Sequence, residues 1–227
     1  WYSADGVNWT QAIASAPWSA RMKATGLVYD GKMWIMGGDT ENDVWYSIDG
    51  ANWTQATASA AWAGRRNHAS VVYDGKMWVI AGSPGSTMQD AWYSTDGVNW
   101  TQATGSAAWS GRDNLQAASF DGALWILGGN TGPANPQNDT WYSYDGANWS
   151  ERTPVPWDAR INHRCVVFDG RLWLIGGSGA SFYNDVWVME GGEDEPWDGV
   201  TGAEWREVTA AGAWSARDDH ACAVYDD

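Results

Sequence analysis

The stretch "GKMWIMGGDTENDVWYSIDGANWTQATASAAWAGR" (residues 31–65) recurs with few changes as "GKMWVIAGSPGSTMQDAWYSTDGVNWTQATGSAAWSGR" (residues 75–112). The chain has 227 residues and 20 tryptophans, and 19 of these tryptophans fall at equivalent places of such a repeat. One series is Trp1, Trp45, Trp92, Trp141 and Trp187, with spacings of 44, 47, 49 and 46 residues. A period of this length indicates that the fold is built from copies of one small unit.

Each period contains signals for four short β-strands and none for a sustained helix. "ASVVY" (69–73) leads through Asp74-Gly75 into "KMWVIAG" (76–82), and Asp-Gly favours the positive φ angles of a tight hairpin turn. "AWYST" (91–95) and "WTQAT" (100–104) form a second predicted hairpin around "DGVN" (96–99). Four strands per period are typical of a β-propeller blade, which buries its faces only against neighbouring blades. We therefore expect an all-β propeller with tryptophans packed between the blades.

Each period also has a glycine pair, then a sequence such as "NDVW" (42–45), a tryptophan about eight residues later and an arginine before the next strand. The pairs are Gly37-Gly38, Gly128-Gly129 and Gly176-Gly177, and Ala81-Gly82 departs from the pattern. This order of residues resembles the kelch repeat, and the resemblance covers essentially the whole chain. It implies a kelch-type β-propeller, of the superfamily that includes the central domain of galactose oxidase.

We expect a single domain over residues 1–227, with blade boundaries near Arg21, Arg65, Arg112, Arg160 and Arg217. Four complete four-stranded blades run from about Arg21 to Thr209. The resemblance to kelch-type propellers implies that residues 1–15 and 217–227 share a fifth blade at the two termini, which would lack its second strand. The alternative is that the chain is a section of a longer array.

The loops from strand 2 to strand 3 differ in every blade, whereas the hairpin turns are near copies of one another. These loops are "DTENDV" (39–44), "SPGSTMQDA" (83–91), "NTGPANPQNDT" (130–140) and "SGASFYNDV" (178–186). In a propeller they share one face with the segments that connect strand 4 to the next strand 1. Varied loops on a rigid scaffold are a common place for binding, and neutral drift of surface loops is the alternative.

The connecting segments concentrate positive charge in a chain whose net charge is −15. In each of them an arginine follows a tryptophan by three residues. The arginines either tie one blade to the next or form a cationic, aromatic-rimmed pocket for an acidic side chain or an anionic sugar. The candidate ligand-binding residues on this face are Lys23, Arg65, Arg66, Arg112, Arg160, Arg164, Arg217, Trp62, Trp109, Trp157, Asn67, His68, His163 and His220. Trp197, which lies outside the repeat register, is a further candidate contact.

Catalysis and metal binding have little support in the sequence. The three histidines share one register, where they would bind a metal if all pointed to the axis, but packing is the expected role. The acidic insertion "EGGEDEPWDG" (190–199) lacks the ligand spacing of a calcium loop. The residue set of the galactose oxidase copper site cannot be assembled from this chain by spacing. We therefore predict no catalytic residue, no metal and no cofactor.

The leading hypothesis is a non-enzymatic propeller that binds a protein or a glycan through the face with the varied loops. The alternatives are a structural or surface-array unit that self-associates through its incomplete blade, and an enzyme acting on an anionic sugar. The negative charge argues against nucleic acid and against an anionic membrane surface as partners. Five Asn-x-Ser/Thr sequons, at Asn8, Asn52, Asn99, Asn138 and Asn148, favour an extracellular or cell-surface location. Cys165 and Cys222, at equivalent repeat positions, would form either a disulfide or two separate thiols.

Overall fold

The computed structural model describes residues 1–153, 155–190 and 204–220, which contain β-strands, turns and irregular segments and no helix. Sixteen strands form four antiparallel sheets of four strands, each in chain order, and we call these sheets blades 1 to 4. Blade 1 comprises β1 (Thr25–Tyr29), β2 (Lys32–Met36), β3 (Val44–Ser47) and β4 (Thr54–Thr57). Blade 2 comprises β5 (Ala69–Tyr73), β6 (Lys76–Ile80), β7 (Ala91–Ser94) and β8 (Thr101–Thr104). Blade 3 comprises β9 (Gln116–Phe120), β10 (Ala123–Leu127), β11 (Thr140–Ser143) and β12 (Ser150–Arg152), and blade 4 comprises β13 (Arg164–Phe168), β14 (Arg171–Ser178), β15 (Phe182–Glu190) and β16 (Trp205–Thr209).

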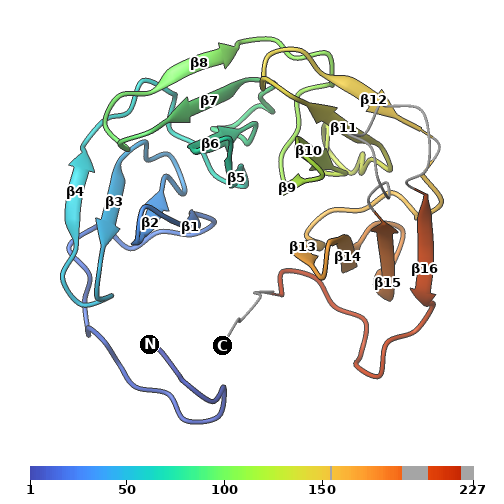
Figure 1. The fold of residues 1–227 in the computed structure, drawn as a ribbon, viewed down its shortest axis with the longest axis horizontal. Coiled ribbons are helices and arrows are strands. Elements are labelled where there is room, and N and C mark those ends of the chain that lie inside the picture. The colour runs from blue at the N-terminus through green and yellow to red at the C-terminus, as the bar shows by residue number, and fades with distance from the viewer. Residues whose placement is uncertain (154, 191–203, 221–227) are drawn as a thin grey trace.

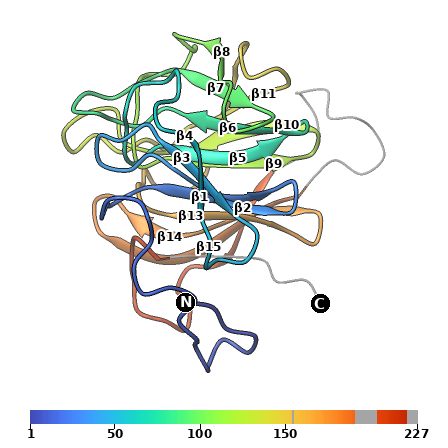
Figure 2. The ribbon, with the colours of Figure 1, turned by 90° about the vertical axis from the view of Figure 1, so that its left-hand side faces the viewer.

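The blades are arranged in an arc around a common axis (Figure 1). The first strands β1, β5, β9 and β13 are innermost and contact one another in succession, whereas the fourth strands lie at the outer rim. The N-terminal segment before β1 extends from blade 1 along the open side of the arc, and Figure 2 shows it projecting beyond the sheets. The all-β, propeller-like architecture expected from the repeat is therefore present.

The first hairpin of each blade turns on Asp-Gly, as the sequence predicts. Asp74 and Gly75 have φ angles of 49° and 64°, and Tyr73 pairs directly with Lys76 across the two-residue turn. Two consecutive left-handed residues match the right-handed twist of the flanking strands. The same pair of positive φ angles occurs in the other three blades, at Asp30-Gly31, Asp121-Gly122 and Asp169-Gly170.

The second hairpin of blades 1 to 3 is held by an aspartate rather than by a two-residue turn. In blade 2, Asp96 Oδ1 accepts hydrogen bonds from the backbone N–H groups of Val98 and Asn99, both at 2.8 Å. Its Oδ2 accepts from Asn99 Nδ2, and Ser94 Oγ donates to Oδ1. Burial by itself would raise the pKa of Asp96, but these hydrogen bonds outweigh it and lower the pKa to about 2. The "YSxDGxN" sequence is therefore a self-contained turn that fixes where β8 begins.

The hydrophobic core lies in three layers, one between each pair of neighbouring blades. At each layer a buried tryptophan from a connecting segment meets a tryptophan of the following blade edge-on, because aromatic rings prefer this geometry to face-to-face stacking. Ring centroids are 5.8 Å apart for Trp62 and Trp100 and 5.9 Å apart for Trp109 and Trp149. Trp18–Trp53 and Trp157–Trp205 make the same contact at 4.6 and 6.1 Å.

A second inter-blade contact requires glycine. Trp78 of β6 is buried, and its ring packs directly against the backbone of Gly146 in the second hairpin of blade 3. A Cβ atom at Gly146 would lie 2.1 Å from Trp78 Cζ3, and at Gly97 it would lie 2.2 Å from Trp34 Cζ3. The glycine of the "DGxN" turn is therefore required both by the positive φ of the turn and by the tryptophan ring of the neighbouring blade that packs against it.

One prediction from the sequence is wrong, and others concern residues that the structure does not describe. The stretch "SGASFYNDV", expected to be a loop, is largely strand, because β14 and β15 continue past a bulge and pair Gly177 with Tyr183 and Ser178 with Phe182. Trp197, Cys222 and most of the C-terminal strand expected for the fifth blade lie outside the described residues.

Candidate functional site

The β2–β3, β6–β7 and β10–β11 loops and the connecting segments lie at the same end of the blades, which we call the loop face. Gly38 N–H donates to the Arg65 carbonyl, and Arg65 N–H donates to the Glu41 carbonyl. Gly82 with Arg112 and Gly129 with Arg160 repeat the first contact. The turns between strands 1 and 2 and between strands 3 and 4 lie at the opposite end, which we call the hairpin face.

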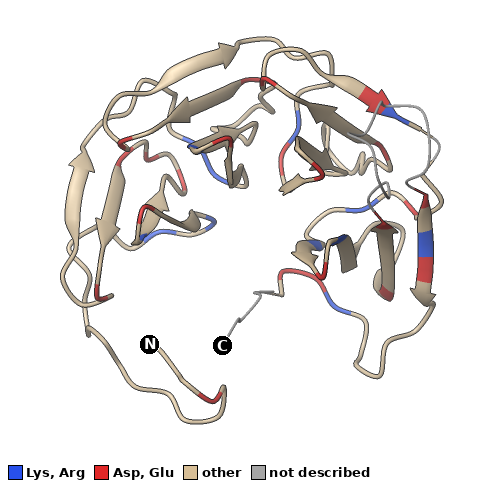
Figure 3. Ribbon diagram, viewed as in Figure 1, with Lys and Arg blue, Asp and Glu red and all other residues tan. Residues whose placement is uncertain are grey.

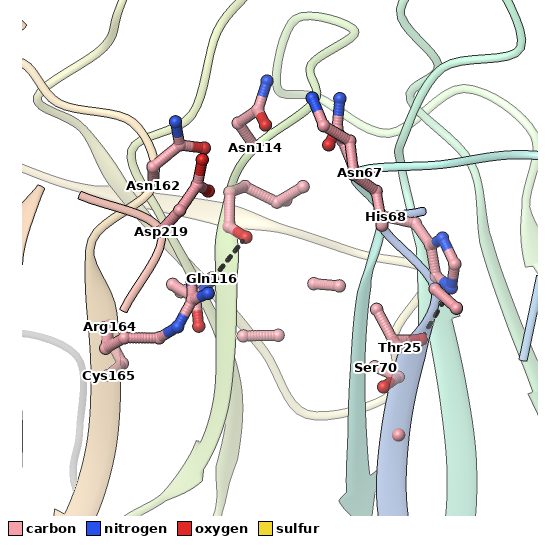
Figure 4. A pocket seen from close by; sticks show the side chains of 16 residues that line it. Thr25, Asn67, His68, Ser70, Asn114, Gln116, Asn162, Arg164, Cys165 and Asp219 are labelled. Atoms are coloured by element: carbon pink, nitrogen blue, oxygen red, sulfur yellow. Dashed lines mark hydrogen bonds between the residues drawn. The ribbon is translucent and has the colours of Figure 1, made fainter. Parts of the chain in front are cut away.

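A cavity of about 430 Å³ opens at the centre of the arc, where the connecting segments enter the inner strands. Its wall consists of the first residues of β1, β5, β9 and β13, the residues just before them, and Asp219 from the segment after β16. Figure 4 shows Asn67, Asn114, Asn162 and Asp219 grouped along one end of the cavity, with Arg164 and Gln116 deeper on its wall. A concave site with several convergent polar groups is the usual form of a ligand pocket.

Five lining residues occupy one repeat position, two residues after the repeated arginine. They are Lys23, Asn67, Asn114, Asn162 and Asp219, and all have left-handed backbones with φ between 51° and 59°. Backbone N–H groups of Asn67, Asn114, Asn162 and Asp219 each donate to the carbonyl of the preceding member, at 2.9 to 3.4 Å. Asparagine and aspartate tolerate this conformation better than most residues, which explains their presence in four of the five places.

This arrangement is a polar ring, a name we keep for these five residues. Lys23 and Asn67 are among the candidate binding residues predicted from the sequence, whereas the cavity-lining residues Asn114, Asn162 and Asp219 are not. The signal was present, since the residue two places after each repeated arginine is lysine, asparagine or aspartate. Residue type alone does not indicate a ring, because the five positions come together only around the axis of the folded chain.

The cavity is polar and carries two cations, Lys23 and Arg164, on different blades. Arg164 Nη1 donates to the carbonyl of His163 at 3.1 Å, and neither cation forms an ion pair with another described residue. Basic residues gather on the inner parts of the blades, around the axis, although the whole chain is strongly acidic (Figure 3). Asp219 supplies a carboxylate to the same wall.

The repeated arginines between the described blades, Arg65, Arg112 and Arg160, are buried and tie neighbouring blades together. Arg112 Nη1 and Nη2 donate to the two carboxylate oxygens of Asp139 at 2.6 and 2.8 Å, and Nη1 also donates to the Gly128 carbonyl. Arg65 with Asp90, Arg160 with Asp185 and Arg21 with Asp43 form the same fork. The backbones of Arg65, Arg112 and Arg160 bind the preceding blade and their side chains bind the following one, so each of these three pairs joins two blades.

The tryptophans three residues earlier are equally enclosed. Trp62, Trp109 and Trp157 are at most 1% exposed, and each lies under its arginine at 5.7 to 5.8 Å from ring centroid to guanidinium carbon. None of these tryptophans, and none of Arg65, Arg112 and Arg160, lines the central cavity. Of the two roles that the sequence left open for these arginines, their burial supports the joining of blades, and it does not fit the aromatic-rimmed pocket.

Of the remaining residues predicted to bind a ligand, only His68 lines the central cavity. Arg66 is exposed on the loop face, where its backbone pairs with Ser83, outside the cavity lining. Arg217 is exposed, and its Nε donates to the Ser215 carbonyl. Of the three histidines, His68 lines the cavity, and His163 and His220 do not.

The histidines are packing residues in the described structure. Burial, with a smaller contribution from the nearby arginine, lowers the pKa of His68 and of His163 to about 3, so both imidazoles are neutral at physiological pH. His68 shares a hydrogen bond of 2.7 Å with Thr25 Oγ1. Within the described residues, no three His, Cys, Asp or Glu side chains come close enough together to bind a metal ion.

Each histidine ring packs against the first glycine of the pair in the preceding blade. A Cβ atom at Gly37 would lie 3.2 Å from Cε1 of His68, and one at Gly128 would lie 3.1 Å from Cε1 of His163. In blade 2 the first glycine is replaced by Ala81, and in blade 3 the histidine is replaced by Leu115. Both substitutes belong to the same buried cluster. Ala81 at the glycine position and Leu115 at the histidine position therefore occur together at the border between blades 2 and 3, where they replace the Gly–His contact of the other borders.

Comparison with known proteins gives the fold and no more. No protein-family model matches the sequence, and no curated protein is significantly similar to it. In the part of the chain that the structure describes, no helix is long and apolar enough to cross a membrane. The solved structure titled "Structure of YjhT" superposes with a TM-score of 0.72 over 92% of this chain and 70% of that chain, at 15% sequence identity. This likeness, together with the four four-stranded sheets, shows an all-β, propeller-like fold.

Proposed function

We propose that this chain is a non-enzymatic, kelch-type propeller that binds a carboxylate-bearing ligand at the mouth of its central cavity. The observation that carries the proposal is the polar ring together with Arg164, which places three asparagine amides and two cations on one concave surface. Neither cation has an ion-pair partner among the described residues. The amides of Asn114 and Asn162 each donate one N–H to a neighbouring aspartate, and the second N–H of each is left for a ligand. Amide groups and cations are the donors that recognise carboxylates. The ligand is an acidic segment of a protein or an acidic sugar at the end of a glycan.

The experiment compares two sources of the carboxylate. Arrays of glycans with sialic or uronic acids and arrays of peptides rich in Asp and Glu are probed with the purified chain. For a ligand found in either array, the K23Q/R164Q variant is expected to bind about a hundredfold more weakly or worse, because hydrogen bonds to charged groups contribute about 1.5–3 kcal/mol each and two such groups are removed. The dissociation constant is measured by titration calorimetry.

The matched control is Arg171→Gln, because Arg171 lies at the hairpin-face turn of blade 4 and pairs there with Asp169 and Glu190. This change should leave the dissociation constant unaltered. An equal affinity of wild type and K23Q/R164Q, or equal binding of the neutral counterparts of the same ligands, would contradict the proposal.

We propose further that residues 1–15 and 217–227 complete a fifth blade. Three groups at the two ends lack the partners that their repeat equivalents have: Trp9 is 58% exposed, Trp214 is 38% exposed, and Arg217 has no carboxylate partner among the described residues. In the repeat, Trp214 is equivalent to Trp62 and Trp9 is equivalent to Trp100, which form an edge-on pair. A closed blade would therefore pair Trp214 with Trp9.

A double-mutant cycle with Trp9→Ala and Trp214→Ala tests the fifth blade. The two changes are expected to be coupled by about 0.5–1.5 kcal/mol in the free energy of unfolding, as for other aromatic pairs. Light scattering of the same samples distinguishes a pair within one monomer, which supports the fifth blade, from a pair between two copies, which supports the assembly-unit alternative. Strictly additive effects would remove both interpretations.

A further inference from the structure

A second cavity, of about 400 Å³, lies on the hairpin face between blades 1 and 2, away from the polar ring. Blade 1 contributes the β1–β2 turn, Trp34, Tyr46 and three residues of β4, and blade 2 contributes the β7–β8 turn. The volume falls within the range of small-molecule sites. We call it the inter-blade cavity.

The equivalent space between blades 2 and 3 shows what keeps the inter-blade cavity open. That space has Tyr73 and Trp78 in place of Tyr29 and Trp34, but its lining includes no residue of the fourth strand, and it measures only about 200 Å³. The residue type differs at the variable position of the "YSxDG" turn, where blade 2 has Thr95 and blade 3 has Tyr144. A tyrosine at this position fills the space that a threonine leaves.

The charges at the inter-blade cavity are already paired within the protein. Lys32 Nζ contacts Asp30 Oδ2 at 2.6 Å and lies 5.8 Å from the centre of the Tyr46 ring. The carboxylate of Asp96 is occupied by the four hydrogen bonds that form its turn. A charged ligand would have to displace one of these partners, so the cavity favours a neutral one.

Hydrogen-bonding groups without charge remain available. Thr54, Gln55 and Thr95 are exposed at the cavity, and their side chains make no hydrogen bond with any other described residue. The half-buried ring of Tyr46 lies on the same wall. Hydroxyl and amide groups beside an aromatic ring match a sugar, which has hydroxyls at its edge and C–H groups on its faces.

We propose that the inter-blade cavity binds a neutral sugar, such as one hexose or N-acetylhexosamine residue of a glycan. The sugar packs against Tyr46, and its hydroxyls hydrogen-bond to Thr54, Gln55 and Thr95. This site is independent of the carboxylate site on the loop face, because the two lie at opposite ends of the blades and share no lining residue. A glycan bound here would approach the molecule from the hairpin face.

The test uses Thr95→Tyr, which copies the residue that blade 3 carries at the equivalent position. Saturation-transfer NMR is recorded with the methyl glycosides of glucose, galactose, mannose and N-acetylglucosamine. Wild type is expected to saturate at least one glycoside, and T95Y is expected to lose that signal. Tyr144→Thr, which enlarges the other space, is the matched control and should retain it.

Because the turn position accepts Ile48, Thr95 and Tyr144 in three blades, T95Y is expected to fold, and circular dichroism verifies this. Gln55→Ala is a second variant, which removes a hydrogen-bonding group from an exposed strand without filling the cavity, and it should weaken the same signal. Absence of saturation transfer to all four glycosides in wild type, or an undiminished signal in both T95Y and Q55A, would overturn the proposal.

Discussion

Replacing Arg112 by methionine is expected to lower the free energy of unfolding by about 3–5 kcal/mol, the cost of breaking a buried ion pair by removing one partner. The Arg112 side chain is 1% exposed and that of Asp139 is 17% exposed, so the carboxyl group of Asp139 would be left with little water to replace the lost guanidinium. The Gly128 and Ser110 carbonyls would each lose a hydrogen bond as well. Urea denaturation followed by circular dichroism measures the change.

Arg171→Met is the matched control, because Arg171 also pairs with an aspartate but its side chain is 39% exposed and that of Asp169 is 70% exposed. Exposed ion pairs contribute less than about 1 kcal/mol, so this variant should be nearly as stable as wild type. Similar losses in both variants would show that the Arg112–Asp139 pair does not join blades 2 and 3 as strongly as its burial indicates.

Gly146→Ala is expected to lower the free energy of unfolding by about 2–5 kcal/mol, from a strained backbone and an overpacked core together. Gly146 has a φ of 72°, which disfavours any residue with a Cβ atom. The new methyl group would also overlap the buried ring of Trp78, which cannot move without disturbing the layer between blades 2 and 3. Thermal and urea unfolding measure the combined effect.

Gly75→Ala separates the two causes. Gly75 has a similar φ of 64°, but a Cβ atom there would meet nothing within 4 Å. The decrease in the free energy of unfolding of G75A is therefore expected to be limited to the cost of the strained backbone, about 1–2 kcal/mol. If G146A and G75A were destabilised equally, the contact between the Trp78 ring and the hairpin of blade 3 would not contribute to stability.

The repeat was sufficient to predict the strands, their pairing and the all-β class, because these depend on local turn chemistry and on a period that the tryptophans mark clearly. The two hairpins around Asp74-Gly75 and Asp96-Gly97 are found where the sequence places them. The roles of the arginines were left open, because deciding between them requires knowing that Asp139, 27 residues after Arg112, folds back against it.

The candidate sites were harder to predict than the fold. The polar ring depends on a left-handed backbone at five separate places, which only the three-dimensional structure brings to one axis. The inter-blade cavity was not predicted, because the hairpin turns are near copies of one another and sequence variation indicated the opposite face. The residue that differs between the two spaces, Thr95 or Tyr144, lies inside an otherwise repeated turn, and its neighbours are known only where two blades meet.

The exchange of Gly and His for Ala81 and Leu115 has a consequence for protein engineering and for the history of such repeats. Blades joined by Gly and His have one kind of junction, and the border between blades 2 and 3 has another. Recombination that moved blade 2 alone, or that duplicated blade 3 beside a different neighbour, would place an alanine methyl group against an imidazole or leave a void under a leucine. Recombination would therefore preserve the packing between blades if its end points lay within blades, so that the two residues of each border moved together. End points at the borders of the sequence repeat would separate these two residues.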